Sequence, residues 1–213
     1  MNFKTFEFSP FHENTYIVYD ETKECVIIDP GNFNEKENNI LDNFLKENHL
    51  KLVGILNTHN HLDHIFGANY LVNKYNVSMA CHEKELEWIG MFEATCKRYG
   101  LKINSTPPTP KNILSDGDVF KFGNTKLDII HMPGHSAGSL VFHNIKDKII
   151  ISGDVIFKNS IGRTDLPGGN YNELIINIKN KLFSLSEDTL ILPGHDVRTT
   201  IGEEKNNNPF FNN

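Results

Sequence analysis

The sequence predicts an α+β protein built as a four-layer αββα sandwich, in which two sheets pack face to face and helices cover their outer faces. The order of the expected elements carries this prediction. Each half of the 213-residue chain contains several strand-like segments, then an amphipathic helical segment and a final strand. This duplication is one of pattern, since no residue-level repeat accompanies it. The length fits one sizeable core, so we expect a single domain over residues 1–213.

In the first half, short segments of alternating apolar and polar residues predict strands, and the unbroken apolar run at 52–56 predicts a strand covered on both faces. Helical spacing of apolar residues predicts three helices between these strands. The expected elements, in order, are strands 3–8, 16–19 and 25–29, helix 35–48, strand 52–56, helix 67–75, strand 77–81 and helix 83–99. In the last helix we expect Leu86, Ile89, Cys96 and Tyr99 to face the core and Gly100 to follow the helix as its cap.

The second half repeats this order of elements. Strands are expected at 119–122, 127–132, 139–143 and 149–152, followed by helix 171–183 and strand 190–192. One face of the helix collects its apolar residues, which are Tyr171, Leu174, Ile175, Ile178 and Leu182.

Four metal-capable side chains follow the covered strand at 52–56 within six positions: His59, His61, Asp63 and His64. The two-residue period of an extended chain places His59 and His61 on one side, and a following turn can bring Asp63 and His64 to a second centre. Imidazole and carboxylate ligands without thiolate suit zinc, iron or manganese. Surface histidines in a polar loop are the alternative, but the density of ligands favours a metal site.

Three further candidate ligands end predicted strands in the second half. They are His135, Asp154 and His195, and each stands directly after a glycine. Glycine permits tight turns and close backbone approach, so a side chain at such a corner can point inward from the rim of a sheet. Taken alone, each is an ordinary turn with a polar residue.

Composition narrows the function classes. A formal net charge of −6 gives no overall basic field with which to hold nucleic acid. No segment approaches the roughly 18 continuous apolar residues of a membrane span, and the N-terminus lacks the apolar core of a signal peptide. The three widely spaced cysteines, Cys25, Cys81 and Cys96, are expected to be buried thiols. We therefore expect a cytoplasmic protein that binds neither nucleic acid nor membranes.

Together, the series His59-x-His61-x-Asp63-His64, His135, Asp154, His195 resembles the metal motif of the metallo-β-lactamase fold superfamily, in matching order. The resemblance implies two divalent metal ions, most readily zinc, with iron or manganese as alternatives. It implies that His59, His61 and His135 hold one ion and that Asp63, His64 and His195 hold the other. Asp154 would bridge the two, as in the hydrolase branches of the superfamily and unlike the lactamases with cysteine at this place.

Segments around 152–169 and 199–210 resemble the short, glyoxalase II-like hydrolases, which are relatives of hydroxyacylglutathione hydrolase. Full-length glyoxalase II also has a C-terminal helical domain and carries a lysine and a tyrosine for glutathione, where this sequence offers Arg163 and Asp165. We therefore expect glutathione to be held differently. Arg163 and Lys158 are candidate substrate contacts, and an Arg163–Asp165 ion pair that fixes the loop is the structural alternative.

The resemblance implies a thioesterase acting on S-acylglutathione-like thioesters. Two bridged divalent ions lower the pKa of a shared water, which provides hydroxide as the nucleophile, and Asp63 can orient that water or pass its proton. A thiolate leaves readily, so no strong general acid is needed. The alternatives are a mononuclear iron persulfide dioxygenase, for which His59, His135 and Asp154 would suffice, and a non-catalytic metal-binding domain. The expected partner is a small thioester, with the protein a monomer or a small homo-oligomer.

Overall fold

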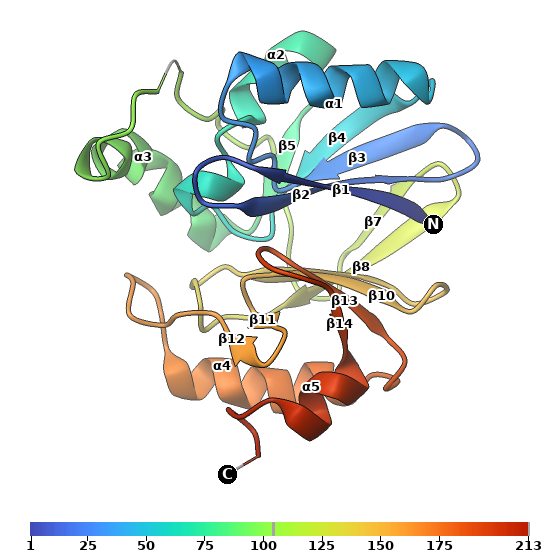
Figure 1. Cartoon of the computed structure of the whole chain (residues 1–213), viewed down its shortest axis with the longest axis vertical. Coiled ribbons are helices and arrows are strands. Elements are labelled where there is room, and N and C mark those ends of the chain that lie inside the picture. Colours follow the sequence, from blue (N-terminus) through green and yellow to red (C-terminus); the bar gives the residue numbers. More distant parts are fainter. Residues whose placement is uncertain (104, 213) are drawn as a thin grey trace.

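The computed structural model describes residues 1–103 and 105–212 and confirms the four-layer prediction. Two six-stranded sheets lie face to face in the centre, and helices cover their outer sides (Figure 1). Within the described ranges, no helix has the length and apolarity required to cross a membrane.

The first sheet has the strand order β1-β2-β3-β4-β5-β6. Its strands are β1 (Asn2–Phe8), β2 (Glu13–Tyr19), β3 (Glu24–Ile28), β4 (Lys51–Leu56), β5 (Met79–Cys81) and β6 (Asn112–Ile113). β1 to β3 pair antiparallel, whereas β3 to β6 pair parallel. Helices α1 (Glu35–Glu47) and α2 (Ala68–Tyr75) lie over the outer face, and α3 (Leu86–Arg98) lies toward one end of the sheet (Figure 1).

The second sheet has the order β14-β13-β10-β9-β8-β7. Its strands are β7 (Val119–Phe122), β8 (Thr125–His131), β9 (Leu140–Asn144), β10 (Ile149–Gly153), β13 (Leu190–Pro193) and β14 (Thr199–Thr200). Helix α4 (Tyr171–Asn177), which continues into a π-helical turn over Ile178–Leu182, covers the outer face together with α5 (Ile201–Asn207). A small hairpin of β11 (Ile156–Phe157) and β12 (Ser160–Ile161) follows β10.

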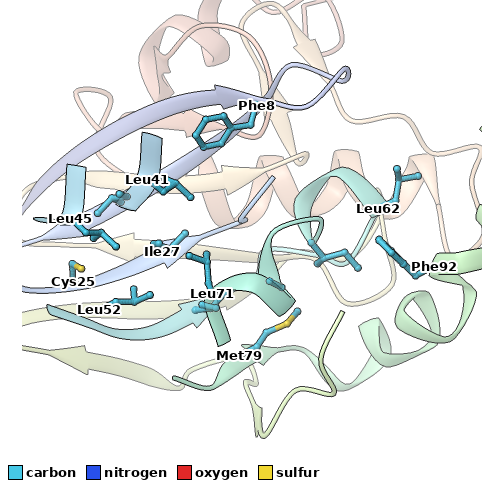
Figure 2. Close-up of a cluster of buried hydrophobic side chains, with 14 of the residues drawn as sticks. Phe8, Cys25, Ile27, Leu41, Leu45, Leu52, Leu62, Leu71, Met79 and Phe92 are labelled. Atoms are coloured by element: carbon cyan, nitrogen blue, oxygen red, sulfur yellow. The ribbon is translucent and has the colours of Figure 1, made fainter. Parts of the chain in front are cut away.

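Three apolar clusters hold the four layers together, one between each pair of neighbouring layers. Because strand side chains alternate, adjacent residues enter different clusters. Ile17 packs under the helices of the first sheet and Val18 between the sheets, while Ile151 packs between the sheets and Ile150 under α4. Figure 2 shows the first cluster, with Ile27 of β3 and Leu41 of α1 among its residues. These clusters explain why the central strands are apolar on both faces.

The predicted helix at 83–99 differs from the structure in its packing. A short 3₁₀ turn (Glu83–Glu85) precedes α3, and Phe92 and Cys96 are the residues that α3 buries in the core. Leu86 and Tyr99 are 40% and 52% exposed, so the prediction that they face the core is wrong. Both are apolar at helical spacing, but α3 lies near the edge of the sheet, where only a narrow stripe of the helix is covered.

The short elements near the C-terminus were not predicted. α5 begins after Thr200, whose hydroxyl accepts a hydrogen bond from the Glu203 N–H, which is the arrangement of an N-cap. Buried Glu204 accepts hydrogen bonds from the Thr199 hydroxyl and the Asn159 N–H, and so ties α5 to the β11–β12 turn. The sequence signal for this helix is the Thr-x-x-Glu pattern at 200–203.

Candidate metal centre

The candidate ligands all follow strand ends that meet at one edge of the sandwich. The segment carrying His59 to His64 follows β4, His135 follows β8, Asp154 follows β10 and His195 follows β13. The loop after β4 is folded back on itself, because Asn57 Nδ2 donates to the His64 carbonyl at 2.8 Å. Loops from both sheets therefore deliver the predicted side chains to one place.

Three histidines form the first ligand cluster. His135 Nε2 lies 3.2 Å from His59 Nε2 and 2.9 Å from His61 Nδ1. All three side chains are buried. Ring nitrogens that converge this closely in a buried place repel one another through their lone pairs unless a proton or a cation lies among them.

Asp63, His64 and His195 form the second cluster. Asp63 Oδ2 lies 3.2 Å from His195 Nε2 and 3.9 Å from His64 Nε2. Asp63 and His64 come from the short 3₁₀ turn Leu62–His64, so a turn does bring this pair toward His195, although the His64 ring also stays 4.1 Å from that of His59. The ligand atoms of each cluster lie within 4.8 Å of one another.

Asp154 lies between the two clusters. Its Oδ2 is 3.6 Å from His135 Nε2 and 3.7 Å from His195 Nε2, while its Oδ1 is 3.5 Å from His64 Nε2. The carboxylate therefore faces histidines of both sets. This is the position that a bridging ligand requires.

Two glycines permit this approach. A side-chain Cβ at Gly194 would lie 2.2 Å from Asp154 Oδ1 and 2.8 Å from His64 Cε1. Gly153 has a φ of +50°, and a Cβ there would lie 2.2 Å from the Thr58 hydroxyl oxygen. Both sites need glycine because any larger residue would displace a ligand or its support.

Most of the candidate histidines are oriented through Nδ1, which leaves Nε2 facing the clusters. His135 Nδ1 lies 2.8 Å from the Arg163 carbonyl, and His195 Nδ1 lies 3.3 Å from the His12 carbonyl. His64 Nδ1 lies 3.1 Å from Asp29 Oδ2. Such contacts fix the ring and favour the tautomer whose other nitrogen can bind a metal.

Asp29 is a supporting residue that the sequence reasoning missed. Its carboxylate accepts hydrogen bonds from the Thr58 N–H at 2.7 Å and the Thr58 hydroxyl at 2.6 Å. The same hydroxyl oxygen lies 3.1 Å from His59 Nδ1. Asp29 thus supports His64 directly and His59 through Thr58.

Glu85 is a second supporting residue that was missed, and it is fully buried. Its carboxylate accepts hydrogen bonds from the Asn60 N–H at 2.8 Å, the Gly138 N–H at 2.7 Å and the Ser136 hydroxyl. Asn60 stands between His59 and His61, and Ser136 follows His135. Glu85 therefore fastens together the two loops that supply the first cluster. A glutamate within a helix-like segment gives no sequence signal of this role.

The donor set fits two divalent ions. His64 Nε2 and Asp154 Oδ1 are buried and have no hydrogen-bond partner within residues 1–103 and 105–212. A metal would satisfy both atoms and would relieve the repulsion among the converging nitrogens of the first cluster. Five imidazoles and two carboxylates suit zinc, iron and manganese alike. The three cysteines are buried elsewhere in the structure as free thiols.

Electrostatics divide the histidines into two kinds. Burial lowers the pKa of His59 well below its usual value and lowers that of His61 to about 3. Burial also opposes protonation of His64, but Asp154 and Asp63 outweigh it and hold its pKa well above the usual value. At His195, burial is likewise outweighed by the hydrogen bond with Asp63, which raises the pKa. In the metal-free protein the first cluster therefore favours neutral imidazoles, whereas the second favours protonated ones.

Metal uptake by chelator-treated protein should consequently release protons. His64 and His195 carry raised pKa values, so they keep their protons above pH 6.5, the usual midpoint, and must lose them to coordinate a metal. The apparent affinity for zinc should rise with pH until these histidines deprotonate. Calorimetric titration in two buffers of different ionisation enthalpy measures this release, with His49→Gln on the surface as the control. Uptake without proton release would contradict the assignment.

A cavity of about 480 Å³ opens above the candidate ligands. Its walls are largely apolar and aromatic, and its floor includes five of the seven candidate ligands. The lining residues are Phe11, His61, Leu62, Asp63, Trp88, Met91, Thr95, Arg98, Tyr99, His135, Asp154, Phe157, Arg163, Leu166, Pro167 and His195. A substrate bound in this cavity would place its reacting group beside the clusters.

The two predicted substrate contacts differ in position. Arg163 lines the cavity, and it also forms a bidentate ion pair with Asp165, from Nε at 2.7 Å and Nη2 at 2.8 Å. Lys158 is exposed in the β11–β12 turn and is not among the described residues that line the cavity. Its contact with substrate stays a prediction. The backbone carbonyl of His12 lies 3.3 Å from His195 Nδ1, and within the described residues His12 is not among those that line the cavity.

Comparison with known proteins agrees with this geometry. Residues 9–195 match the family model of the metallo-beta-lactamase superfamily. The hydroxyacylglutathione hydrolase GloC of Haemophilus influenzae is 34% identical over 213 residues, covering 100% of this chain and 99% of that protein. Among solved structures, the BLEG-1 B3 metallo-beta-lactamase superposes with a TM-score of 0.91 at 34% identity over all of both chains. TTHA1623 in a di-iron-bound form gives 0.86 at 33% identity, over 97% of this chain and 99% of that one. The chain therefore belongs to the metallo-beta-lactamase superfamily, as a metallo-hydrolase with a glyoxalase II-like relative.

Proposed function

We propose that the protein is a thioesterase that hydrolyses S-acylglutathione-like thioesters and uses two divalent metal ions for catalysis. We expect both ions to be zinc. The observation that carries the proposal is the position of Asp154 between two complete ligand clusters at the floor of a largely apolar cavity. The named activity of the Haemophilus influenzae relative supports the same substrate class. By the sequence resemblance, His59, His61 and His135 would hold one ion, and Asp63, His64 and His195 the other.

When bound, the two ions acidify a water molecule and polarise the scissile carbonyl, which stabilises negative charge on its oxygen. Among the protein's own side chains, Asp63 lines the cavity, and its Oδ2 faces His195 and His64. The ion pairs of Asp63 within the described residues use Oδ2, which leaves Oδ1 to orient a water molecule and to accept its proton.

The overall reaction adds water across the carbon–sulfur bond. A carbon–oxygen bond forms at the carbonyl, the carbon–sulfur bond breaks, and the sulfur leaves as a thiolate that takes up a proton from solvent. Apart from Asp63 and Asp154, the described lining of the cavity contains no carboxyl group that could protonate a leaving group. A thiolate needs no such acid, whereas the amine or alkoxide of an amide or ester does. A thioester therefore makes the smallest demand for a general acid at this site.

Thiol release from S-lactoylglutathione tests the proposal. The wild-type protein, loaded with zinc and analysed for metal, should release thiol in step with loss of the thioester. His59→Ala removes one ligand of the first cluster and should abolish turnover, while His49→Gln on the surface should not change it. Circular dichroism of both variants establishes that they are folded. Folded, two-metal wild-type protein without thiol release would contradict the proposed substrate class.

The cleavage of a β-lactam is a second candidate, because of the similarity to the BLEG-1 structure. By the sequence resemblance, Asp154 occupies the position at which some lactamases carry a cysteine ligand. An aspartate at this position favours the glyoxalase II-like hydrolases over those lactamases. Nitrocefin in the same assay separates the two activities. We expect its hydrolysis to be far slower than that of the thioester, and the reverse order would favour the lactamase.

A further inference from the structure

Helix α3 presents a second face, distinct from its core face, to the cavity. Trp88, Met91, Thr95 and Arg98 line the cavity at spacings of three, four and three residues, which is the spacing of one helical stripe. Trp88 packs edge-on against the ring of His61, with centroids 4.3 Å apart. The stripe thus runs from the first ligand cluster at Trp88 toward the end of the helix at Arg98.

The wall that faces α3 comes from the segment after Asp154. It contributes Phe157, Arg163, Leu166 and Pro167 to the lining of the cavity. Its charge is compensated within the segment itself, because Asp165 accepts both hydrogen bonds from the Arg163 guanidinium. The opposite wall therefore adds apolar surface and no free positive charge.

Arg98 differs from Arg163 in this respect. It is exposed, and no carboxylate within residues 1–103 and 105–212 lies within 4 Å of its side chain as an ion pair. Its place in the last turn of α3 suits the negative end of the helix dipole, but Lys97 satisfies that preference equally well. Lys97 lines a different hollow with Glu93 and Gly100. The dipole therefore accounts for a basic residue at this end of α3, but not for one that faces the cavity.

We propose that Arg98 is a specificity-determining residue that binds a carboxylate at the end of the substrate remote from the scissile bond. The inference rests on the proposed thioesterase function for the identity of the reaction. A guanidinium pairs with a carboxylate through two parallel hydrogen bonds, and within the described residues no ion pair occupies the charge of Arg98. The apolar stripe between Arg98 and the ligand clusters suits a substrate with an uncharged middle part. The ligand is thus an acyl thioester with a terminal carboxylate, on either its thiol or its acyl part.

A binding measurement tests the subsite without any turnover. Calorimetric titration of the metal-loaded protein would use S-hexylglutathione, which has no bond that can be hydrolysed at sulfur, and its dimethyl ester, which lacks the carboxylate charges. Arg98→Met should weaken the binding of S-hexylglutathione about 10-fold, or about 1.4 kcal/mol, and leave that of the diester unchanged. Arg98→Lys should recover part of the loss. Lys97→Met is the matched control, since it removes the same charge from the neighbouring position, and it should change neither affinity.

Kinetics then locate the carboxylate. A raised KM for S-lactoylglutathione in Arg98→Met, with kcat retained, places the carboxylate on the thiol part. A raised KM only for the succinyl thioester of N-acetylcysteamine places it on the acyl part. Equal effects of Arg98→Met on charged and uncharged ligands, or no effect on any of them, would overturn the subsite. If Arg98 binds charged ligands but the protein releases no thiol, the subsite stands and the thioesterase function is overturned. If the protein releases thiol and Arg98→Met changes neither binding nor KM, the thioesterase function stands and the subsite is overturned.

Discussion

Asp154→Asn is expected to lower the rate of thiol release by about 1,000-fold or more, which corresponds to at least about 4 kcal/mol of transition-state stabilisation. The asparagine keeps the shape of the side chain but removes the negative charge that faces His64, His135 and His195. Although burial raises the pKa of Asp154, the neighbouring histidines, His64 above all, hold it well below its usual value. The carboxylate is therefore ionised at neutral pH, and an uncharged amide cannot replace it between two cations.

Metal analysis of the same variant locates the defect. We expect fewer than two ions per chain in Asp154→Asn, because the bridging ligand is the one that both sites share. Asp188→Asn is the matched control, since it makes the same change at an exposed carboxylate that pairs with Lys148 instead. It should keep both ions and most of the turnover. An Asp154→Asn protein with two ions and full activity would contradict the bridging role.

Glu85→Gln is expected to weaken metal binding by about 10- to 100-fold, the range typical of residues that hold ligands in place. The amide puts an NH₂ group where the carboxylate receives hydrogen bonds from Asn60, Ser136 and Gly138. At least one of these donors then loses its acceptor in a buried place, which costs about 1–3 kcal/mol of folding free energy. Burial raises the pKa of Glu85, and the hydrogen bonds from Ser136, Asn60 and Gly138 oppose that rise because they stabilise the carboxylate.

Two readouts separate positioning from plain destabilisation. The dissociation constant for zinc, measured by competition with a chromophoric chelator below the melting temperature, should rise in Glu85→Gln. Glu83→Gln changes an exposed carboxylate in the same 3₁₀ turn and should leave both that constant and the melting temperature unchanged. A lower melting temperature in Glu85→Gln with unchanged zinc affinity would show that Glu85 only stabilises the fold.

The main helices and strands and the seven candidate ligands could be predicted from the sequence, and the physical reason differs between the elements and the ligands. Strands such as β4 and β10 are covered on both faces, so their apolar runs are unbroken. The ligands are recognisable because so few side chains can bind a metal, and because they follow strand ends, as at His59 and His135. The structure brings all seven together, as the resemblance implies.

The supporting residues could not be read in this way. Glu85 and Asp29 act through hydrogen bonds to partners 25 or more positions away, and such contacts leave no local pattern. The prediction of how α3 packs was wrong for a related reason. Periodicity shows that Leu86 and Tyr99 share a helical face with core residues, but it does not show how much of that face the sheet covers. The cavity lining, including Arg98, depends on the same unpredictable placement of α3.

The most direct test of the account is the dependence of activity on metal content. Chelator-treated protein would be titrated with zinc, and separately with iron(II) under anaerobic conditions, while thiol release from S-lactoylglutathione is followed. Two ligand clusters that share Asp154 predict that activity rises until about two equivalents are bound and then levels off, with no oxygen consumed when air is admitted. The contrary result is a protein that releases no thiol from the thioester but consumes oxygen with glutathione persulfide, at a rate that is maximal with one equivalent of iron. It would contradict the two-metal thioesterase and establish the mononuclear dioxygenase instead.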